Sequence, residues 1–202
     1  LINLIPRFYD CSDGVILING QNVKDYTQNV LHEMIGYVPQ KGILFSGSVK
    51  DNIKYGNENA TDEEIAKAID ISQSNFIYNF PEGLDYHISQ GGKNVSGGQK
   101  QRLSIARAII KNPDILIFDD SFSALDYKTD KIVRQKLNEN FKDTTKVIVA
   151  QRIGTIMNAD IIVVLNEGKI VGMGKHEDLL KTCDVYREIA LSQLSKEELE
   201  NE

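Results

Sequence analysis

A short apolar run that ends in two carboxylates constrains the fold of this chain more than any other feature. Residues 115–118, Ile-Leu-Ile-Phe, are followed at once by Asp119 and Asp120. Continuous apolar runs of this kind are typical of strands buried on both faces, as in a parallel sheet. Ligands of such sheets bind beyond the carboxyl ends of the strands. We therefore expect both aspartates at a ligand site, where a carboxylate oxygen suits a hard cation such as Mg²⁺.

A candidate anion site precedes this strand. Ser96, Gly97 and Gly98 stand directly before a helical run over residues 99–111. The first turn of a helix leaves backbone N–H groups unpaired at its positive end, which favours a phosphate. Ser96 can cap the helix and can also reach a phosphate oxygen. By itself the pattern fits an ordinary capped helix equally well, and the acidic strand end that follows favours phosphate binding.

These segments resemble the nucleotide-binding domain of ATP-binding cassette (ABC) transporters. The resemblance extends over about residues 1–193, and the motifs occur in the family's order. They are the Q-loop (residues 35–40), the segment that follows it in exporter-type members (45–53), the signature motif (95–99), the Walker B strand (115–119) and the D-loop (123–126).

The resemblance implies an α/β fold: a P-loop NTPase core of the ABC type, with a parallel sheet flanked by helices and a helical subdomain. The core would comprise residues 1–45 and 113–202, and the helical subdomain, ending in the signature helix, residues 46–112. The chain contains no G-x-x-x-x-G-K-S/T loop. In the family this Walker A loop comes just before a helix similar to residues 1–9. We therefore expect a chain truncated just after the loop, without the strand that precedes it and inactive by itself.

The resemblance also implies the cofactors, ATP and Mg²⁺, and roles for single residues. Asp119 and Gln40 would lie at the metal, and Asp120, Gln151 and Gln40 would be the catalytic residues. In the family two such domains face each other head to tail, so that the signature of one contacts the nucleotide of the other. The residues expected to contact nucleotide at this seam are Ser96, Gly97, Gly98, Gln99 and Asp126.

Two departures from the family pattern affect catalytic positions, and a third, Val95 in place of the usual leucine, lies in the signature motif. Asp120 stands where the family usually has the glutamate that polarises the attacking water, and Gln151 where it usually has a switch histidine. Aspartate is one methylene shorter, and a misplacement of about 1 Å can cost roughly a hundredfold in rate. Glutamine cannot carry the positive charge of a protonated histidine. We therefore expect a slow site in one half of a heterodimeric exporter whose partner half carries the competent site.

Charge and hydropathy limit the partners. The formal net charge of −6 over 202 residues speaks against nucleic acid, because nucleic-acid-binding surfaces are basic. No apolar run reaches the length of a membrane span. We expect membrane association only through a transmembrane domain of the parent chain, which would place these residues at the cytoplasmic face of the cell membrane. Cys11 and Cys183 show no metal-site spacing, and a reduced setting is expected.

Two other functions stay open. One is a soluble ABC-family ATPase of DNA repair or translation, against which the exporter-like residues 45–53 and the absence of basic patches speak. The other is a non-catalytic regulatory ABC module, which Asp120 and Gln151 favour and the intact signature motif does not. The local patterns also predict further elements: helices over residues 62–71, 74–80 and 128–140, buried strands over 146–150 and 161–165, and a hairpin turn over 166–169.

Overall fold

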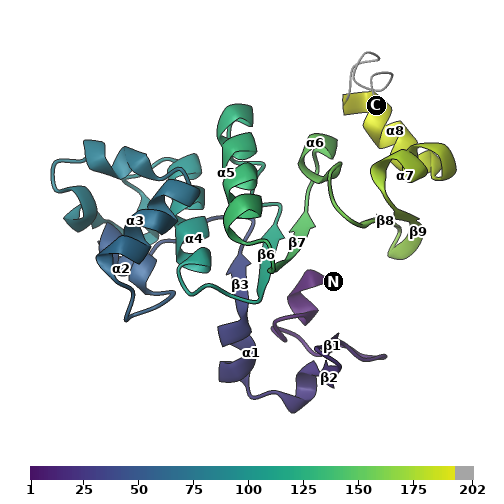
Figure 1. The fold of residues 1–202 in the computed structure, drawn as a ribbon, viewed down its shortest axis with the longest axis horizontal. Helices are drawn as coiled ribbons and strands as arrows, with labels where there is room; N and C mark the ends of the chain where they lie inside the picture. Colours follow the sequence, from purple (N-terminus) through teal and green to yellow (C-terminus); the bar gives the residue numbers. More distant parts are fainter. Residues whose placement is uncertain (194–202) are drawn as a thin grey trace. The chain divides into compact units, whose positions relative to one another are not determined.

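The computed structural model describes residues 1–193, which fall into two compact units (Figure 1). The first unit runs from Leu1 to Val149, and the second begins at Ala150. Each unit has a hydrophobic core of its own side chains, so the two are described separately.

A parallel sheet of three strands organises the first unit. Its order is β3 (Ile35–Val38), β6 (Ile115–Asp119), β7 (Thr145–Val149), and both pairings are parallel. Successive side chains of a strand point to opposite faces. Leu116 and Phe118 accordingly pack into the core formed with the larger helices, whereas Ile117 packs on the opposite face. The predicted parallel sheet and the bounds of its central strand are confirmed.

Helices cover both faces of this sheet. On one face α4 (Gly97–Ile109) and α5 (Tyr127–Asn140) contribute Leu103 and Val133 to the larger core. On the other face α1 (Gln28–Met34) contributes Leu31 to a smaller core. The remaining helices of the larger core, α2 (Val49–Lys54) and α3 (Asp62–Ile71), gather beside α4 (Figure 1). The expected α/β arrangement is therefore present.

Reciprocal caps fix where three of these helices begin. Ser48, Thr61 and Ser96 each accept the backbone N–H of the residue three positions later, whose side chain accepts the N–H of the capping residue. This capping box satisfies two otherwise unpaired donors of the first turn. It accounts for the agreement between the predicted and observed start of α3.

Short elements complete the first unit. The hairpin of β1 (Leu17–Ile18) and β2 (Gln21–Asn22) turns through Asn19 and Gly20, with φ of 51° and 80°. Such left-handed pairs match the twist of a two-residue hairpin. The other short elements are η1 (Ile2–Leu4), η2 (Val23–Asp25), β4 (Gly47–Ser48), η3 (Asn75–Asn79), η4 (Gly83–Asp85), β5 (His87–Ile88) and η5 (Gln90–Gly92).

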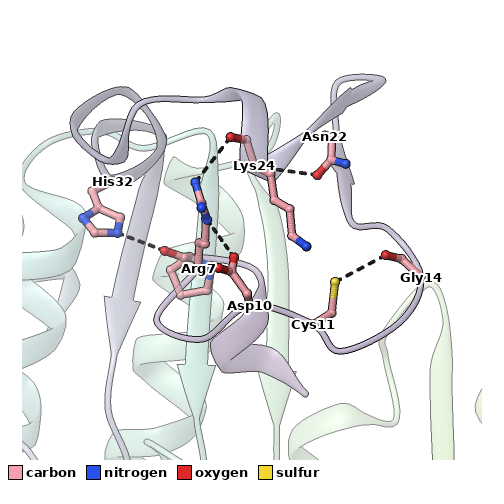
Figure 2. A network of polar contacts seen from close by, with 8 residues as sticks. Arg7, Asp10, Cys11, Gly14, Asn22, Lys24 and His32 are labelled. Carbon is pink, nitrogen blue, oxygen red and sulfur yellow. Dashed lines mark hydrogen bonds and ion pairs between the residues drawn. The ribbon is translucent and has the colours of Figure 1, made fainter.

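Two predicted α-helices are wrong in type. Residues 1–9 form only the short 3₁₀ segment η1 followed by turns, and the helix predicted over 74–80 is the 3₁₀ segment η3. Polar contacts anchor the N-terminal segment to later elements (Figure 2). Arg7 binds the Asp10 carboxylate at 2.8 Å and donates to the carbonyl of Lys24 at 3.3 Å, while His32 Nε2 lies 2.9 Å from the carbonyl of Pro6.

The second unit is an antiparallel hairpin packed on helices. Its turn places Glu167 and Gly168 at φ of 49° and 76°, which confirms the predicted turn. The strand predicted over residues 161–165 is present, but it is not buried on both faces as expected. Val163 is 46% exposed and Leu165 49% exposed, because only the other face of the hairpin packs on the helices. Its elements are α6 (Ile153–Ile156), β8 (Ile162–Asn166), β9 (Lys169–Gly174), α7 (His176–Thr182) and α8 (Asp184–Gln193).

Among the helices that the structure describes, none is long and apolar enough to cross a membrane.

Candidate functional site

The carboxyl ends of β3 and β6 bring three predicted site residues to one edge of the sheet. Gln40 follows β3, and Asp119 and Asp120 lie at the end of β6, the parallel neighbour of β3. The amide of Gln40 donates from Nε2 to Oδ2 of Asp120 over 3.3 Å. The Q-loop glutamine therefore lies in hydrogen-bond contact with the acidic strand end.

Asp120 is held from several sides. It is only 6% exposed, and its φ of 47° lies in the left-handed region, which aspartate tolerates better than most residues. Its N–H donates to the carbonyl of Val149 at 3.0 Å, and its own carbonyl accepts the hydroxyl of Ser123 at 2.8 Å. The carboxylate of Asp120 is thus carried on backbone that β6, β7 and the D-loop fix together.

Asp119 has a partner that sequence reasoning missed. The hydroxyl of Tyr37 lies 3.0 Å from Asp119 Oδ2 and 2.8 Å from Asn3 Oδ1. Burial, together with the hydrogen bond and the charge of Asp119, raises the pKa of Tyr37 to about 12. The phenol therefore stays protonated and can donate to the carboxylate at neutral pH. The contact joins residues 82 positions apart, so no local pattern could have indicated it.

The oxygen donors at this edge fit a magnesium ion that also binds a phosphate. Mg²⁺ prefers oxygen, keeps several waters and is usually bound through one or two carboxylates plus substrate phosphates. Asp119 offers a carboxylate, and Gln40, whose Nε2 is engaged with Asp120, offers its amide oxygen. No cluster of three or more His, Cys, Asp or Glu residues that could hold a metal occurs within residues 1–193. Asp119 and Gln40 are therefore candidate oxygen ligands for such an ion.

The predicted anion site is a capped and open helix start. Ser96 Oγ accepts the N–H of Gln99 at 3.2 Å, and Gln99 Oε1 accepts the N–H of Ser96 at 2.8 Å. A Cβ built on Gly97 would meet no atom within 4 Å, whereas one on Gly98 would lie 3.3 Å from the carbonyl oxygen of Ala124. Glycine at 97 is therefore not required by packing within the described chain, and its open face is available to a ligand.

The D-loop residue Asp126 begins α5. Its carboxylate accepts the N–H of Thr129 at 3.0 Å, and hydrogen bonds from Thr129 lower the pKa of Asp126. Arg102, one turn along α4, contributes an opposite charge and lies over the ring of Phe76, with 4.5 Å between Arg102 Cζ and the ring centroid. Since Gly98 also abuts Ala124, the signature helix and the D-loop lie together.

Gln101 is a second residue that sequence reasoning missed. It is 1% exposed, accepts the N–H of Gly42 at 2.8 Å and donates to the carbonyl of Pro39 at 2.9 Å. These bonds fix the loop that carries Gln40 against the signature helix. Its partners lie 59 and 62 positions away in the sequence, which is why only the fold reveals them.

Gln151 lies in the second unit and is exposed. Its carbonyl accepts Gln193 Nε2 at 2.7 Å, and Gln193 Oε1 accepts the N–H of Ile153 at 2.9 Å. Gln193 thus fixes the backbone around Gln151 to the end of α8. The role of Gln151 beside Asp120 stays a prediction.

A pocket of about 300 Å³ is lined by residues from the N-terminal segment, β3 and α4, among other parts of the first unit. Aromatic and basic side chains line it, among them Phe8, Tyr37, Arg107 and Lys111. Burial lowers the pKa of both Arg107 and Lys111. None of the predicted site residues lines this pocket, so it is distinct from the carboxylate edge.

Comparison with known proteins gives consistent matches. A family model described as ABC transporter matches residues 1–123. Putative multidrug export ATP-binding/permease proteins of Staphylococcus aureus strains NCTC 8325 and Mu50 are each 47% identical over 190 residues, which is 94% of this chain and 33% of each relative. Among solved structures, a bacterial Atm1-family ABC exporter with ATP bound superposes with a TM-score of 0.92 at 37% identity, over 96% of this chain and 35% of that chain. The chain therefore spans about a third of the length of these proteins.

Proposed function

This chain belongs to the ABC transporter family, and on that premise we propose that it binds ATP with Mg²⁺ and takes part in ATP hydrolysis by an exporter. Its α/β fold matches the nucleotide-binding domain of such exporters. The observation that carries the proposal is the meeting of Gln40, Asp119 and Asp120 at one edge of a parallel sheet. Ligands of parallel sheets bind at this edge.

Each residue has a chemical task in this proposal. Asp119 and Gln40 would hold Mg²⁺, which when bound neutralises charge on the phosphate oxygens. Asp120 accepts a hydrogen bond from the attacking water and so orients it. The open first turn of α4, with Ser96 and Gly97, offers backbone donors to the γ-phosphate of a nucleotide bound by a second domain.

We further propose that this chain's own site is slow and that it works in a heterodimer. Asp120 is shorter than glutamate, and its rigid backbone and the contact with Gln40 leave little freedom to compensate. Gln151 cannot supply the charge of a histidine. The signature motif keeps its serine, both glycines and its glutamine, and Ser96 and Gln99 cap the start of α4. This chain would therefore complete the partner's site, which would be the competent one.

The longer parent would couple this ATPase to export across the cell membrane. The relatives are named as ATP-binding/permease proteins for multidrug export. By analogy we propose that the parent chain has a transmembrane domain and that the present domain lies at the cytoplasmic face. We propose a cargo of the multidrug class and no nucleic acid as partner.

We also propose the division into an α/β core (1–45 and 113–202) and a helical subdomain (46–112). The match to permease fusions favours this function over a soluble ABC-family ATPase of DNA repair or translation.

A non-catalytic regulatory module is the second candidate, favoured by Asp120 and Gln151. ATP turnover and transport by the parent, purified with its partner half, separate the two candidates. The Asp120→Glu variant is expected to retain transport and to raise basal ATP turnover, since the longer carboxylate reaches further toward the water. The same change at the exposed Asp143 serves as control and should alter neither quantity. A pair without Mg²⁺-dependent turnover would refute the ATPase proposal, and a loss of transport in Asp120→Glu would refute the slow site.

A further inference from the structure

We propose that Tyr37 is a positioning residue for Asp119, holding its carboxylate ready for the divalent cation that accompanies the nucleotide. The inference rests on the proposed function and adds a residue to which the motifs give no role. Three observations carry it: the register of the sheet, the packing of the Tyr37 ring and the hydrogen bonds of its hydroxyl.

The register places the two side chains on one face of the sheet. Tyr37 of β3 pairs with Ile117 of β6, and Asp119 follows Ile117 by two residues. Residues two apart in a strand share a face. The hydroxyl at the end of the long Tyr37 side chain thereby reaches the carboxylate at the strand end, over 3.0 Å.

Packing fixes the ring that carries this hydroxyl. Phe8 meets the ring of Tyr37 edge to face, with 5.2 Å between the centroids. The ring also packs against the smaller core, which contains Ile35 and Ile117. A ring held on several sides offers its hydroxyl from one position, which is what a residue that orients another side chain requires.

The hydrogen bonds give the hydroxyl a direction. A phenol has one hydrogen to donate, and two acceptors lie near it, Asp119 Oδ2 at 3.0 Å and Asn3 Oδ1 at 2.8 Å. The two ends of an asparagine amide are assigned from the network and can be exchanged. With the amide turned, Asn3 donates to the Tyr37 oxygen and Tyr37 donates its single hydrogen to Asp119. Tyr37 would then hold Oδ2 of Asp119 and leave Oδ1 for the cation.

The test uses Mn²⁺ as probe, on the longer protein paired with its partner half. Electron paramagnetic resonance measures free Mn²⁺ in a titration with the protein in excess over ATP, so that little unbound ATP remains to chelate the metal in solution. A second titration measures ATP affinity in EDTA. Loss of a group that orients a metal ligand typically weakens metal affinity by about 10–100-fold. We expect Tyr37→Phe to weaken Mn²⁺ binding by roughly tenfold and to leave the metal-free ATP affinity unchanged.

Two control variants separate positioning from structure. Tyr26→Phe removes another half-buried hydroxyl beside the same core, which donates to the carbonyl of Ile18 at 3.0 Å, and should change neither affinity. Asn3→Ala leaves Tyr37 free to donate to Asp119 and should keep Mn²⁺ affinity within about twofold. If Asn3→Ala reproduces the loss seen in Tyr37→Phe, then Tyr37 acts by anchoring the N-terminal segment and the inference is wrong.

The other outcomes are equally distinct. Equal Mn²⁺ affinity in the parent and in Tyr37→Phe overturns the inference alone. A parallel loss of metal-free ATP affinity in Tyr37→Phe also overturns it, because a general disturbance of the site would then explain both. A parent pair that binds no Mn²⁺ together with ATP instead overturns the proposed function.

Discussion

Ser96 shows how one side chain can serve the fold and a ligand together. Its hydroxyl caps α4 through the N–H of Gln99, and Gln99 returns the contact to the N–H of Ser96. The same end of the helix carries partial positive charge, which attracts a phosphate. Stability and function can therefore be tested separately at this position, because aspartate is as good a cap as serine and yet repels an anion.

The Ser96→Asp variant should keep the stability of the domain and lose ATP turnover in the heterodimer. The loss of a single donor to a developing anion costs about 10²–10³ in rate, and a repelling carboxylate should cost at least as much. Ser96→Ala makes the reverse comparison. Loss of the cap should lower the free energy of unfolding by about 1 kcal/mol, and ATP turnover should fall less than in Ser96→Asp. Thermal unfolding and ATPase rates of both variants check the prediction, and full turnover by Ser96→Asp would contradict it.

At the scale of elements, the start of the signature helix is tied to the loop after β3 by Gln101. This buried amide satisfies the N–H of Gly42 and the carbonyl of Pro39. The loop also lies very close to α4, since a Cβ on Gly42 would come within 2.9 Å of the backbone of Lys100. The Q-loop and the signature helix of this chain are therefore held as one structural piece.

Replacing Gln101 with leucine should destabilise the domain by about 2 kcal/mol, because a buried donor or acceptor left unpaired costs about 1–3 kcal/mol. Gln101→Glu is the matched comparison: it still accepts from Gly42 but cannot donate to Pro39 at neutral pH unless it is protonated. Denaturant unfolding monitored by circular dichroism measures both changes. A Gln101→Leu variant as stable as the parent would show that the tie contributes nothing.

The elements also show where sequence patterns are sufficient. The bounds of β6 and α3 match the prediction because their signals are local: an apolar run ended by acids, and a capping box at Thr61. The run at residues 161–165 is apolar throughout and therefore indicated a buried strand, but β8 buries only alternate side chains. The hairpin turn predicted over residues 166–169 implies a partner strand, which the structure supplies as β9. Local patterns also do not distinguish the 3₁₀ turns of η3 from an α-helix.

The residues of the candidate site also differ in whether a local sequence pattern indicates them. Asp119, Asp120 and Ser96 stand next to strong local patterns, and the structure places them at a strand end and a helix start as expected. Tyr37 and Gln101 act through partners far away in the sequence, so they become visible only when β3, β6 and α4 are brought together.

At the scale of the whole molecule, the 202-residue chain contains the signature, Walker B and D-loop motifs but no G-x-x-x-x-G-K-S/T loop. In the family this loop supplies most of the contacts to the phosphates. We predict that the 202-residue chain alone shows no measurable ATPase activity and binds ATP with at best millimolar affinity. Isothermal titration calorimetry with Mg-ATP checks this, and micromolar affinity or Mg²⁺-dependent turnover by a pure sample would refute it.

The central claim is that this chain lends a working signature motif to its partner while its own Asp120 serves a slow site. Gly97→Asp and Asp120→Asn test the two parts of the claim separately. A Cβ on Gly97 meets no atom within 4 Å, and an acid in the first turn suits the helix, so Gly97→Asp should fold normally. Gly97→Ala controls for the added Cβ without the charge.

The most direct measurement is the ATPase rate of the reconstituted heterodimer with each variant in turn. We expect Asp120→Asn to retain most of the turnover and Gly97→Asp to lower it by about a hundredfold or more, since the added negative charge stands where the partner's γ-phosphate must approach. Loss of turnover in Asp120→Asn together with normal turnover in Gly97→Asp would contradict the account. So would a parent that is fully active as a homodimer, because both of its sites would then carry Asp120 and Gln151.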